Sequence, residues 1–410
     1  MSAPRALVVG MGIAGLAAAM RLREVGWEPV VVERAPDRRP AGYFVGLFET
    51  GRATAQRMGV LDAIGNRADP DGTTYDVDRS GERRRPSMGY GDLPGDPRLI
   101  MRGDIEAALY PQVAETAEIR YGTTPVAIEE HPDGVDVTLR TTTAGDADSG
   151  WAATETTERF DLVVGADGLR STVRKLVFGP DSRLLRPLNH IIGATLLKEQ
   201  VPGFRPTDGL ILAEEGRSAW VFPFVDHAPG VLFSYRTDDE DAEFRGTPIE
   251  SLRAAYGPEA PGLILQSLLD QFEAADDSLF DSVHQVEMPR WHTNRVVLIG
   301  DSAWCLTLYS GMGASLGLAG ADLLGTTLAR NPGHTARALR EWEQRLRPFV
   351  SVQQRSGRTD GLAMFVPQNR RDLAMRNVMS KVTSNRLTNK AMRAFIATKF
   401  KEKSLDVAAP

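Results

Sequence analysis

The sequence has a single cysteine, Cys305, among its 410 residues. One cysteine excludes an intramolecular disulfide and a zinc site built from cysteines. The formal net charge is −6, so the basic excess that nucleic-acid-binding proteins present to phosphates is missing. The first apolar run, Ala6 to Met20, follows Arg5 as in a secretion signal, but it is too short to cross a bilayer. We therefore expect a cytoplasmic protein with no metal site, no nucleic-acid partner and no stable membrane insertion.

The most informative stretch is the first thirty-odd residues. The short apolar run RALVVG predicts a buried parallel strand, and Gly10, Gly12 and Gly15 follow it in G-x-G-x-x-G spacing at the start of an Ala/Leu-rich helix. A second apolar strand ends at Glu33, about 20 residues further on. This arrangement indicates a dinucleotide site, in which the glycines admit a pyrophosphate and Glu33 accepts hydrogen bonds from a ribose. The predicted binding residues here are Gly10, Gly12, Ile13, Ala14, Gly15, Glu33 and Arg34.

Two later segments repeat the sequence of strand, acidic turn and helix start. Phe160 to Val164 predicts a buried strand before the turn Gly165-Ala-Asp167-Gly168, and a helix opens at Ser171. The run from Arg295 ends in Gly300-Asp301, and a loop with Gly311 and Gly313 leads into a helix over about 315–330. Turns at the carboxyl ends of such strands are where open α/β sheets bind ligands.

The regions between these segments differ in composition and in their pattern of apolar residues. Residues 69–97 are polar and rich in Gly, Pro and Arg, and residues 187–288 read as antiparallel strands with one helix over 251–273. A further strand pair is expected over 119–140. The aromatic residues on the strands of the second region are expected mainly in the core, with some lining an apolar pocket: Trp220, Phe222, Phe224, Phe233 and Tyr235.

The fold class predicted from this pattern is α/β. A Rossmann-like FAD-binding domain over 1–70, 100–180 and 286–350 would carry an inserted, mostly antiparallel substrate domain over 71–99 and 181–285. A helical segment over 351–410 would complete the chain. Residues 369–403 are basic with clustered apolar positions. We expect this segment to pack on the body, and contact with a membrane or an acidic partner is the alternative.

Taken together, the three motifs resemble those of the FAD-dependent aromatic hydroxylases, the para-hydroxybenzoate hydroxylase-like flavoprotein monooxygenases. The resemblance covers about residues 3–350 and implies one extended FAD with no separate nicotinamide domain. It places Glu33 on the adenosine ribose, Arg102 near the FAD and Asp301 at the ribityl–phosphate region. It also assigns Gly300, Gly311, Gly313 and Ala314 to the cofactor, and links Asp167 to both FAD and NAD(P)H.

The third motif departs from the family pattern. Where the family has His, Pro, Gln and Asn, this sequence has Trp304, Leu308, Met312 and Ser315. These changes leave the backbone groups and Asp301 in place, so FAD binding is expected to survive. They leave open whether the usual oxygen chemistry is retained, and the family's proline lies beside the reactive edge of the flavin. We expect the indole of Trp304 and the leucine to alter access to that edge.

The resemblance implies a monooxygenase that uses NAD(P)H and O2 to oxygenate an aromatic or polyketide-like small molecule, as in antibiotic biosynthesis. A non-redox cyclase or isomerase that keeps FAD as a structural element is the alternative, and a non-catalytic flavin-binding protein is a third. No catalytic base can be assigned from the sequence. The histidines near the substrate strands are expected to be structural, namely His190, His227, His284 and His292. The oligomeric state is expected to be monomer or homodimer.

Overall fold

The computed structural model describes residues 3–38, 43–87, 97–144, 151–384 and 405–409. Its strands are β1 (Arg5–Val9), β2 (Glu28–Val32), β3 (Phe44–Leu47), β4 (Thr73–Val77), β5 (Arg83–Ser87), β6 (Arg98–Met101), β7 (Glu118–Arg120), β8 (Thr123–His131), β9 (Gly134–Ala144), β10 (Trp151–Phe160), β11 (Leu162–Gly165), β12 (Leu185–Leu196), β13 (Asp208–Glu214), β14 (Arg217–Phe222), β15 (Gly230–Arg236), β16 (Leu279–Val286) and β17 (Val296–Leu298).

The helices are α1 (Ile13–Glu24), α2 (Glu49–Arg57), α3 (Leu61–Ile64), α4 (Arg102–Ala114), α5 (Thr172–Val177), α6 (Asp181–Leu184), α7 (Glu240–Glu243), α8 (Pro248–Tyr256), α9 (Gly262–Glu273), α10 (Asp301–Trp304), α11 (Gly313–Arg330), α12 (Thr335–Ser356), α13 (Leu362–Phe365) and α14 (Arg370–Ser384). A 3-10 turn, η2 (Leu308–Ser310), and a π turn, η3 (Gly357–Gly361), join the later helices. None of the helices in the described ranges is both long and apolar enough to cross a bilayer.

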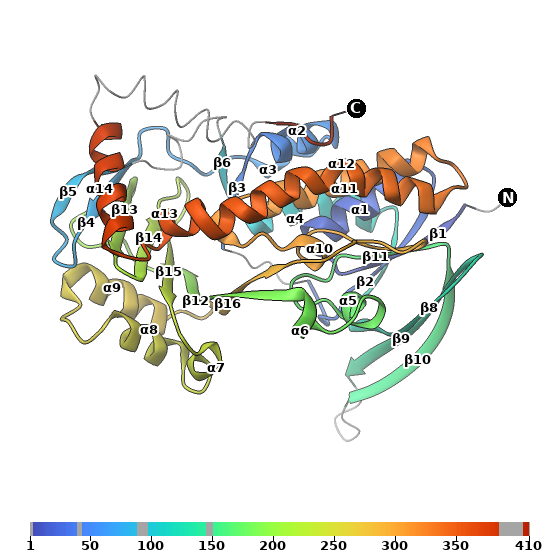
Figure 1. Cartoon of the computed structure of the whole chain (residues 1–410), viewed down its shortest axis with the longest axis horizontal. Helices are drawn as coiled ribbons and strands as arrows, with labels where there is room; N and C mark the ends of the chain where they lie inside the picture. Colours follow the sequence, from blue (N-terminus) through green and yellow to red (C-terminus); the bar gives the residue numbers. More distant parts are fainter. Residues whose placement is uncertain (1–2, 39–42, 88–96, 145–150, 385–404, 410) are drawn as a thin grey trace.

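A five-stranded parallel sheet in the order β17-β11-β1-β2-β7 forms the centre of the nucleotide-binding part. Strands β1, β11 and β17 are almost entirely apolar, as expected for a sheet covered on both faces. Helices α1, α11 and α12 pack together in one layer, and α12 is the long orange helix of Figure 1. The predicted α/β fold class is confirmed, and each of the three motifs follows a strand of this sheet.

A seven-stranded, mostly antiparallel sheet forms the other half, in the order β16-β12-β15-β14-β13-β4-β5. Strands β4 and β5 therefore join strands that lie much later in the chain, through a parallel pairing of β4 with β13 in which Thr73 lies opposite Asp208. The strands of the predicted segments 71–99 and 181–285 share this one sheet. The division of the chain into domains stays a prediction.

The two faces of this sheet carry two different clusters of side chains. Phe233 and Tyr235 point to the face covered by α8 and α9, where they form a core with side chains of those helices. Trp220, Phe222 and Phe224 belong to a cluster on the opposite face. The period of two keeps Trp220 and Phe222 on one face of β14, and the register places Trp220 opposite Leu232, so the neighbouring Phe233 points to the other face.

Some sequence-based expectations need correction. The single helix expected over 251–273 is two helices, α8 and α9, because Gly257-Pro258 interrupts the hydrogen-bond ladder. The strand pair expected over 119–140 begins later, since β7 joins the parallel sheet. Strand β8 pairs with β9, and β9 also pairs with β10 in a three-stranded sheet.

The segment after residue 351 contains the C-terminal helices that the sequence predicts. Helix α14 packs against β5, at the left of Figure 1. The chain returns at 405–409, where the backbone N–H of Val407 donates to Thr50 Oγ1 (3.2 Å) and Asp406 pairs with Arg57. Most of the predicted basic stretch between them lies outside the described residues.

Candidate functional site: a cavity joining both sheets

One cavity of about 1450 Å³ is lined by residues of the parallel sheet's motifs and by residues of the seven-stranded sheet. Every predicted binding residue except Gly15 lines it, although the residues come from six separate stretches of the chain. The members of this set are Gly10, Gly12, Ile13, Ala14, Glu33, Arg34, Arg102, Asp167, Gly300, Asp301, Gly311, Gly313 and Ala314. The structure therefore brings these residues to one place, while their individual contacts with a cofactor stay predictions.

The glycine fingerprint forms a tight cradle at one end of the cavity. Gly10 has φ of +101°, and a side chain there would come within 2.6 Å of the Ala166 carbonyl oxygen. A Cβ on Gly15 would lie only 1.9 Å from the Gly10 carbonyl oxygen, so this glycine serves helix–strand packing rather than the cavity. A Cβ on Gly12 would lie 3.1 Å from the guanidinium of Arg102. The backbone of Gly12 and this cation thus face the same small space, which suits a pyrophosphate.

Glu33 directly follows β2 and supports the cradle directly. One carboxylate oxygen accepts a hydrogen bond from Met11 N and the other accepts one from Ala35 N, both at 2.9 Å. The acid is therefore fixed beside the fingerprint loop and still lines the cavity. Carboxylate oxygens have further lone pairs for a ribose hydroxyl.

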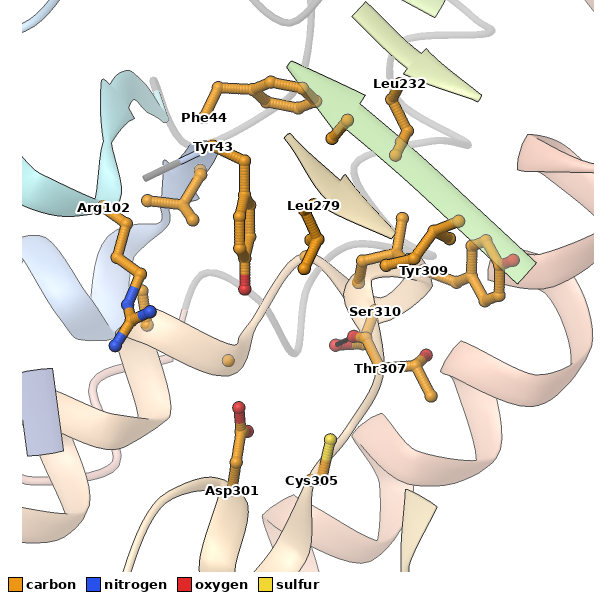
Figure 2. A pocket seen from close by; sticks show the side chains of 18 of the residues that line it. Tyr43, Phe44, Arg102, Leu232, Leu279, Asp301, Cys305, Thr307, Tyr309 and Ser310 are labelled. Carbon is orange, nitrogen blue, oxygen red and sulfur yellow. Dashed lines mark hydrogen bonds between the residues drawn. The ribbon is translucent and has the colours of Figure 1, made fainter. Parts of the chain in front are cut away.

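Asp301 lies at the middle of the cavity, where α10 begins. Figure 2 shows its carboxylate directed into the cavity, with the Tyr43 hydroxyl and the Arg102 guanidinium across the space. The carboxylate is open to the cavity but enclosed by protein, and this burial raises its pKa against the opposing effect of Arg102. Arg102 begins α4 and pairs with Glu106 at 3.0 Å. Burial also raises the pKa of Tyr43, so its hydroxyl stays protonated at neutral pH.

Asp167 contributes mainly to local structure. Its two oxygens accept hydrogen bonds from the Ser171 hydroxyl, from Thr172 N (2.6 Å) and from Val173 N (3.1 Å), which anchors the start of α5. Burial raises the pKa of this carboxyl although these hydrogen bonds favour its charged form. The acceptors of Asp167 are thus occupied by the protein, while the turn around it lines the cavity.

Arg174 connects the second motif to the third. Its side chain is fully buried and donates to the Ser302 carbonyl (3.0 Å), the Leu169 carbonyl (2.6 Å) and Asp181 (2.6 Å). In the opposite direction the Ser302 hydroxyl donates to the Gly165 carbonyl at 2.7 Å. The turns at the ends of β11 and β17 are therefore held together by hydrogen bonds as well as by strand pairing.

The four departures in the third motif do not all face the cavity. The indole of Trp304 is fully buried against Trp291 and Trp342, with ring centroids 4.8 and 5.8 Å away, and it does not line the cavity. The expectation that this indole alters access to the flavin is therefore wrong. Met312 is also buried, and the Ser315 hydroxyl accepts a hydrogen bond from Phe48 N (3.0 Å). Only Leu308 lines the cavity.

The end of the cavity on the seven-stranded sheet is apolar and aromatic. The rings of Phe44 and Phe222 have centroids 3.7 Å apart, and Trp220 stacks on Phe365 at 4.6 Å. The Trp220 Nε1–H donates to the Phe365 carbonyl at 3.3 Å, so this indole is held by α13. Trp220 and Phe222 confirm that some of the predicted aromatic residues line a pocket, and Phe44 and Leu232 complete the wall seen in Figure 2.

Several lining residues were missed by the reasoning from sequence. Tyr43 and Phe44 lie where β3 begins, and Asp372, Met375 and Arg376 come from the terminal helix α14. Neither stretch carries a recognisable motif. An aromatic pair directly after a glycine, and an arginine spaced with the apolar positions of a terminal helix, were the available signals.

Of the histidines considered, only His284 lines the cavity. Its Nε2 lies 3.3 Å from Glu240, and its Nδ1 lies 3.3 Å from the Ser282 hydroxyl. His190 Nδ1 contacts the Leu188 carbonyl at 2.6 Å, and burial lowers its pKa. These contacts are consistent with structural roles.

The residues of the cavity fit FAD. The space beside Gly12 has no room for a side chain at that position, and the Arg102 guanidinium lies next to it. The carboxylate of Asp301 is open to the cavity. The groups that would hold the cofactor are the backbone of the fingerprint, Glu33, Arg102 and Asp301, with the start of α11 at Gly313. The remaining volume at the aromatic end would accept a separate small molecule.

Comparison with known proteins agrees with this geometry. The chain is 27% identical over 358 residues to a flavin-dependent monooxygenase from an unknown prokaryotic organism, covering 86% of this chain and 87% of that protein. It is 24% identical over 413 residues to the FAD-dependent monooxygenase asL4 of Sarocladium schorii, covering 92% of each. Among solved structures, Klebsiella pneumoniae HpxO complexed with FAD and uric acid has a TM-score of 0.73 at 19% identity, covering 96% of this chain and 97% of that chain.

The tetracycline destructase Tet(55) has a TM-score of 0.74 at 24% identity, covering 96% of this chain and 97% of that one. These structural similarities establish the fold. The model of the FAD binding domain family matches residues 4–349, which include all three motifs. The chain belongs to the FAD binding domain family, whose relatives named here include flavin-dependent monooxygenases.

Proposed function

We propose that the protein is an FAD-dependent monooxygenase that uses NAD(P)H and O2 to oxygenate an aromatic or polyketide-like small molecule in the cytoplasm, as a monomer or homodimer. The observation that carries this proposal is the cavity that joins the two sheets. It has the FAD motifs at one end and an aromatic pocket at the other. A cofactor and a substrate bound in it would share one enclosed space.

The chemistry that FAD supplies when bound is acceptance of a hydride from NAD(P)H and activation of O2. The protein's part is to bind, orient and exclude water. Trp220, Phe222 and Phe44 give the substrate end flat apolar walls, which suit a planar substrate and keep bulk water out. Positioning the substrate is the contribution of these aromatic walls.

The proposal is tested by anaerobic stopped-flow bleaching of the flavin followed by turnover under 18O2. We expect slow bleaching by NAD(P)H alone and faster bleaching with the true substrate bound, because substrate-gated reduction limits wasteful release of peroxide. One labelled oxygen should appear in the product. Conversion of substrate without flavin reduction or oxygen uptake would refute the monooxygenase and support the non-redox cyclase or isomerase. Flavin binding without any turnover would support a non-catalytic protein.

A further inference from the structure

Tyr43 and Phe44 are neighbours in the chain, but their side chains face different parts of the cavity. Phe44 is the first residue of β3, and its ring lies against Phe222 at the substrate end. Tyr43 directly precedes β3, and Figure 2 shows its side chain directed the other way, toward Asp301 at the flavin end, where the FAD motifs lie. Successive residues of an extended chain point to opposite sides, which accounts for this divergence. The flavin end therefore contains an aromatic hydroxyl that none of the three motifs supplies.

The backbone fixes Tyr43 beside Arg102. Strands β3 and β6 pair so that Phe44 lies opposite Met101, and the N–H of Arg102 donates to the Tyr43 carbonyl at 3.1 Å. The Arg102 guanidinium and the Asp301 carboxylate both lie close enough to the Tyr43 hydroxyl to act on its pKa. The hydroxyl thus shares its part of the cavity with two side chains that are predicted to bind FAD.

The Tyr43 hydroxyl is available to a ligand. Within the described part of the chain it has no hydrogen-bond partner. The residue is 39% exposed, and Figure 2 shows the hydroxyl directed into the open space of the cavity. Burial raises its pKa, so the group is a neutral donor near pH 7. Because an enclosed hydroxyl without a partner is costly, a ligand oxygen that accepts from it would gain binding free energy.

The neighbouring groups divide the flavin end into a donor side and an acceptor side. Arg102 has only donors, and the backbone of Gly12 faces the same space. The ionised carboxylate of Asp301 has only acceptors, which suit hydroxyl groups rather than phosphate oxygens. Arg102 is also paired with Glu106 at 3.0 Å, so its charge is partly balanced before any phosphate binds. A phosphate beside Arg102 would therefore gain from a further donor.

We propose that Tyr43 is a further FAD-binding residue, whose hydroxyl donates a hydrogen bond to an oxygen of the phosphate next to the ribityl chain. The ligand chemistry it recognises is a phosphate ester joined to a polyol, with the phosphate on the side of Arg102 and the polyol on the side of Asp301. The contact needs neither NAD(P)H nor O2. It therefore goes beyond the proposed function and can be tested without turnover.

Calorimetric titration of the full-length apoprotein with FAD tests this contact. Tyr43→Phe removes the hydroxyl and keeps the ring, so the Kd for FAD should rise roughly tenfold, as expected when a hydrogen bond to a charged acceptor is lost. Tyr75→Phe, on β4 and outside the cavity lining, is the matched control and should leave the Kd unchanged. An unchanged Kd for Tyr43→Phe would overturn the proposal. The Tyr43→Phe apoprotein should unfold at no lower temperature than the wild type, and a lower temperature would show that the hydroxyl already has a protein partner.

Phosphorus NMR of the FAD-loaded proteins identifies the acceptor. Tyr43→Phe should shift the resonance of one of the two phosphates of bound FAD, and Tyr75→Phe should shift neither. A weaker affinity with both resonances unchanged would mean that the hydroxyl binds another part of the cofactor, and the proposal would fail. A protein that shows the expected shift but never oxidises NAD(P)H would refute the proposed function alone.

Discussion

The hydroxyl of Tyr309 lies 2.6 Å from the hydroxyl of Ser234, and both residues are buried. Tyr309 belongs to the turn η2 in the third motif's loop, and Ser234 lies in β15, an interior strand of the seven-stranded sheet. This hydrogen bond joins the flavin end of the cavity to its substrate end. Burial also raises the pKa of Tyr309, so the link does not ionise at neutral pH.

Tyr309→Phe should loosen the loop over 305–311 without moving the sheet. The loss leaves the Ser234 hydroxyl buried without its partner, so we expect a destabilisation of about 1 to 3 kcal/mol in denaturant unfolding. Ser234→Ala and the double variant complete a double-mutant cycle. Because the loop faces the cavity, Tyr309→Phe should also increase NAD(P)H oxidation that yields peroxide instead of product. Additive single effects in the cycle would mean that the two hydroxyls are not coupled.

Gly12→Val should block cofactor binding while leaving the fold intact. The new side chain enters the space beside Arg102, where a Cβ alone already approaches the guanidinium to 3.1 Å. The purified protein should lose its yellow colour and its bound FAD, measured after denaturation. Ala153→Val, on an exposed part of β10, is the matched control and should keep full occupancy. Retention of full FAD occupancy by Gly12→Val at micromolar protein would show that the pyrophosphate lies elsewhere.

Asp301→Asn should weaken FAD binding and yet stabilise the apoprotein near pH 7. Burial raises the pKa of Asp301, so the folded apoprotein binds this proton more tightly than the unfolded chain does. Stability from this group is therefore fully present below the unfolded pKa and is lost as pH rises through the folded pKa. The uncharged amide of the Asp301→Asn variant does not ionise, so the variant does not lose this stability as pH rises. Thermal unfolding of both apoproteins should show an advantage for Asp301→Asn at neutral pH that disappears in acid; an advantage that grows in acid would contradict the raised pKa.

Trp304→Phe should change the free energy of unfolding, whereas Leu308→Ala should change the rate at which the flavin is reduced. Trp304 is packed between two other indoles away from the cavity, so its truncation should reduce the free energy of unfolding by less than the ~3–5 kcal/mol of a change to alanine. The rate of flavin reduction should not change. Leu308 lines the cavity, and its truncation should alter that rate at nearly constant stability. Stopped-flow bleaching and denaturant unfolding of both variants give the comparison, and a reversed pattern would place Trp304 at the flavin after all.

The nucleotide-binding part was predictable because its signals are local. Gly10, Gly12 and Glu33 must keep a fixed spacing to bind a dinucleotide, and apolar strand patterns accompany them. The direction of Trp304 was not predictable, since nothing in its neighbours along the chain indicates that Trp291 and Trp342 will surround it. The same holds for Arg376, whose place at the cavity depends on a pairing with Asp76, a residue 300 positions away.

The parallel pairing of β4 with β13 has a consequence for how the chain acquires its structure. During synthesis β4 and β5 emerge long before β13, so this hairpin must wait with an open edge while much of the parallel sheet's sequence is made. Such distant pairings slow folding because a large loop has to close first. Fragments that end before β13 should therefore associate through this edge. A shortened gene product that contains the first two flavin motifs but stops before β13 would be prone to aggregate.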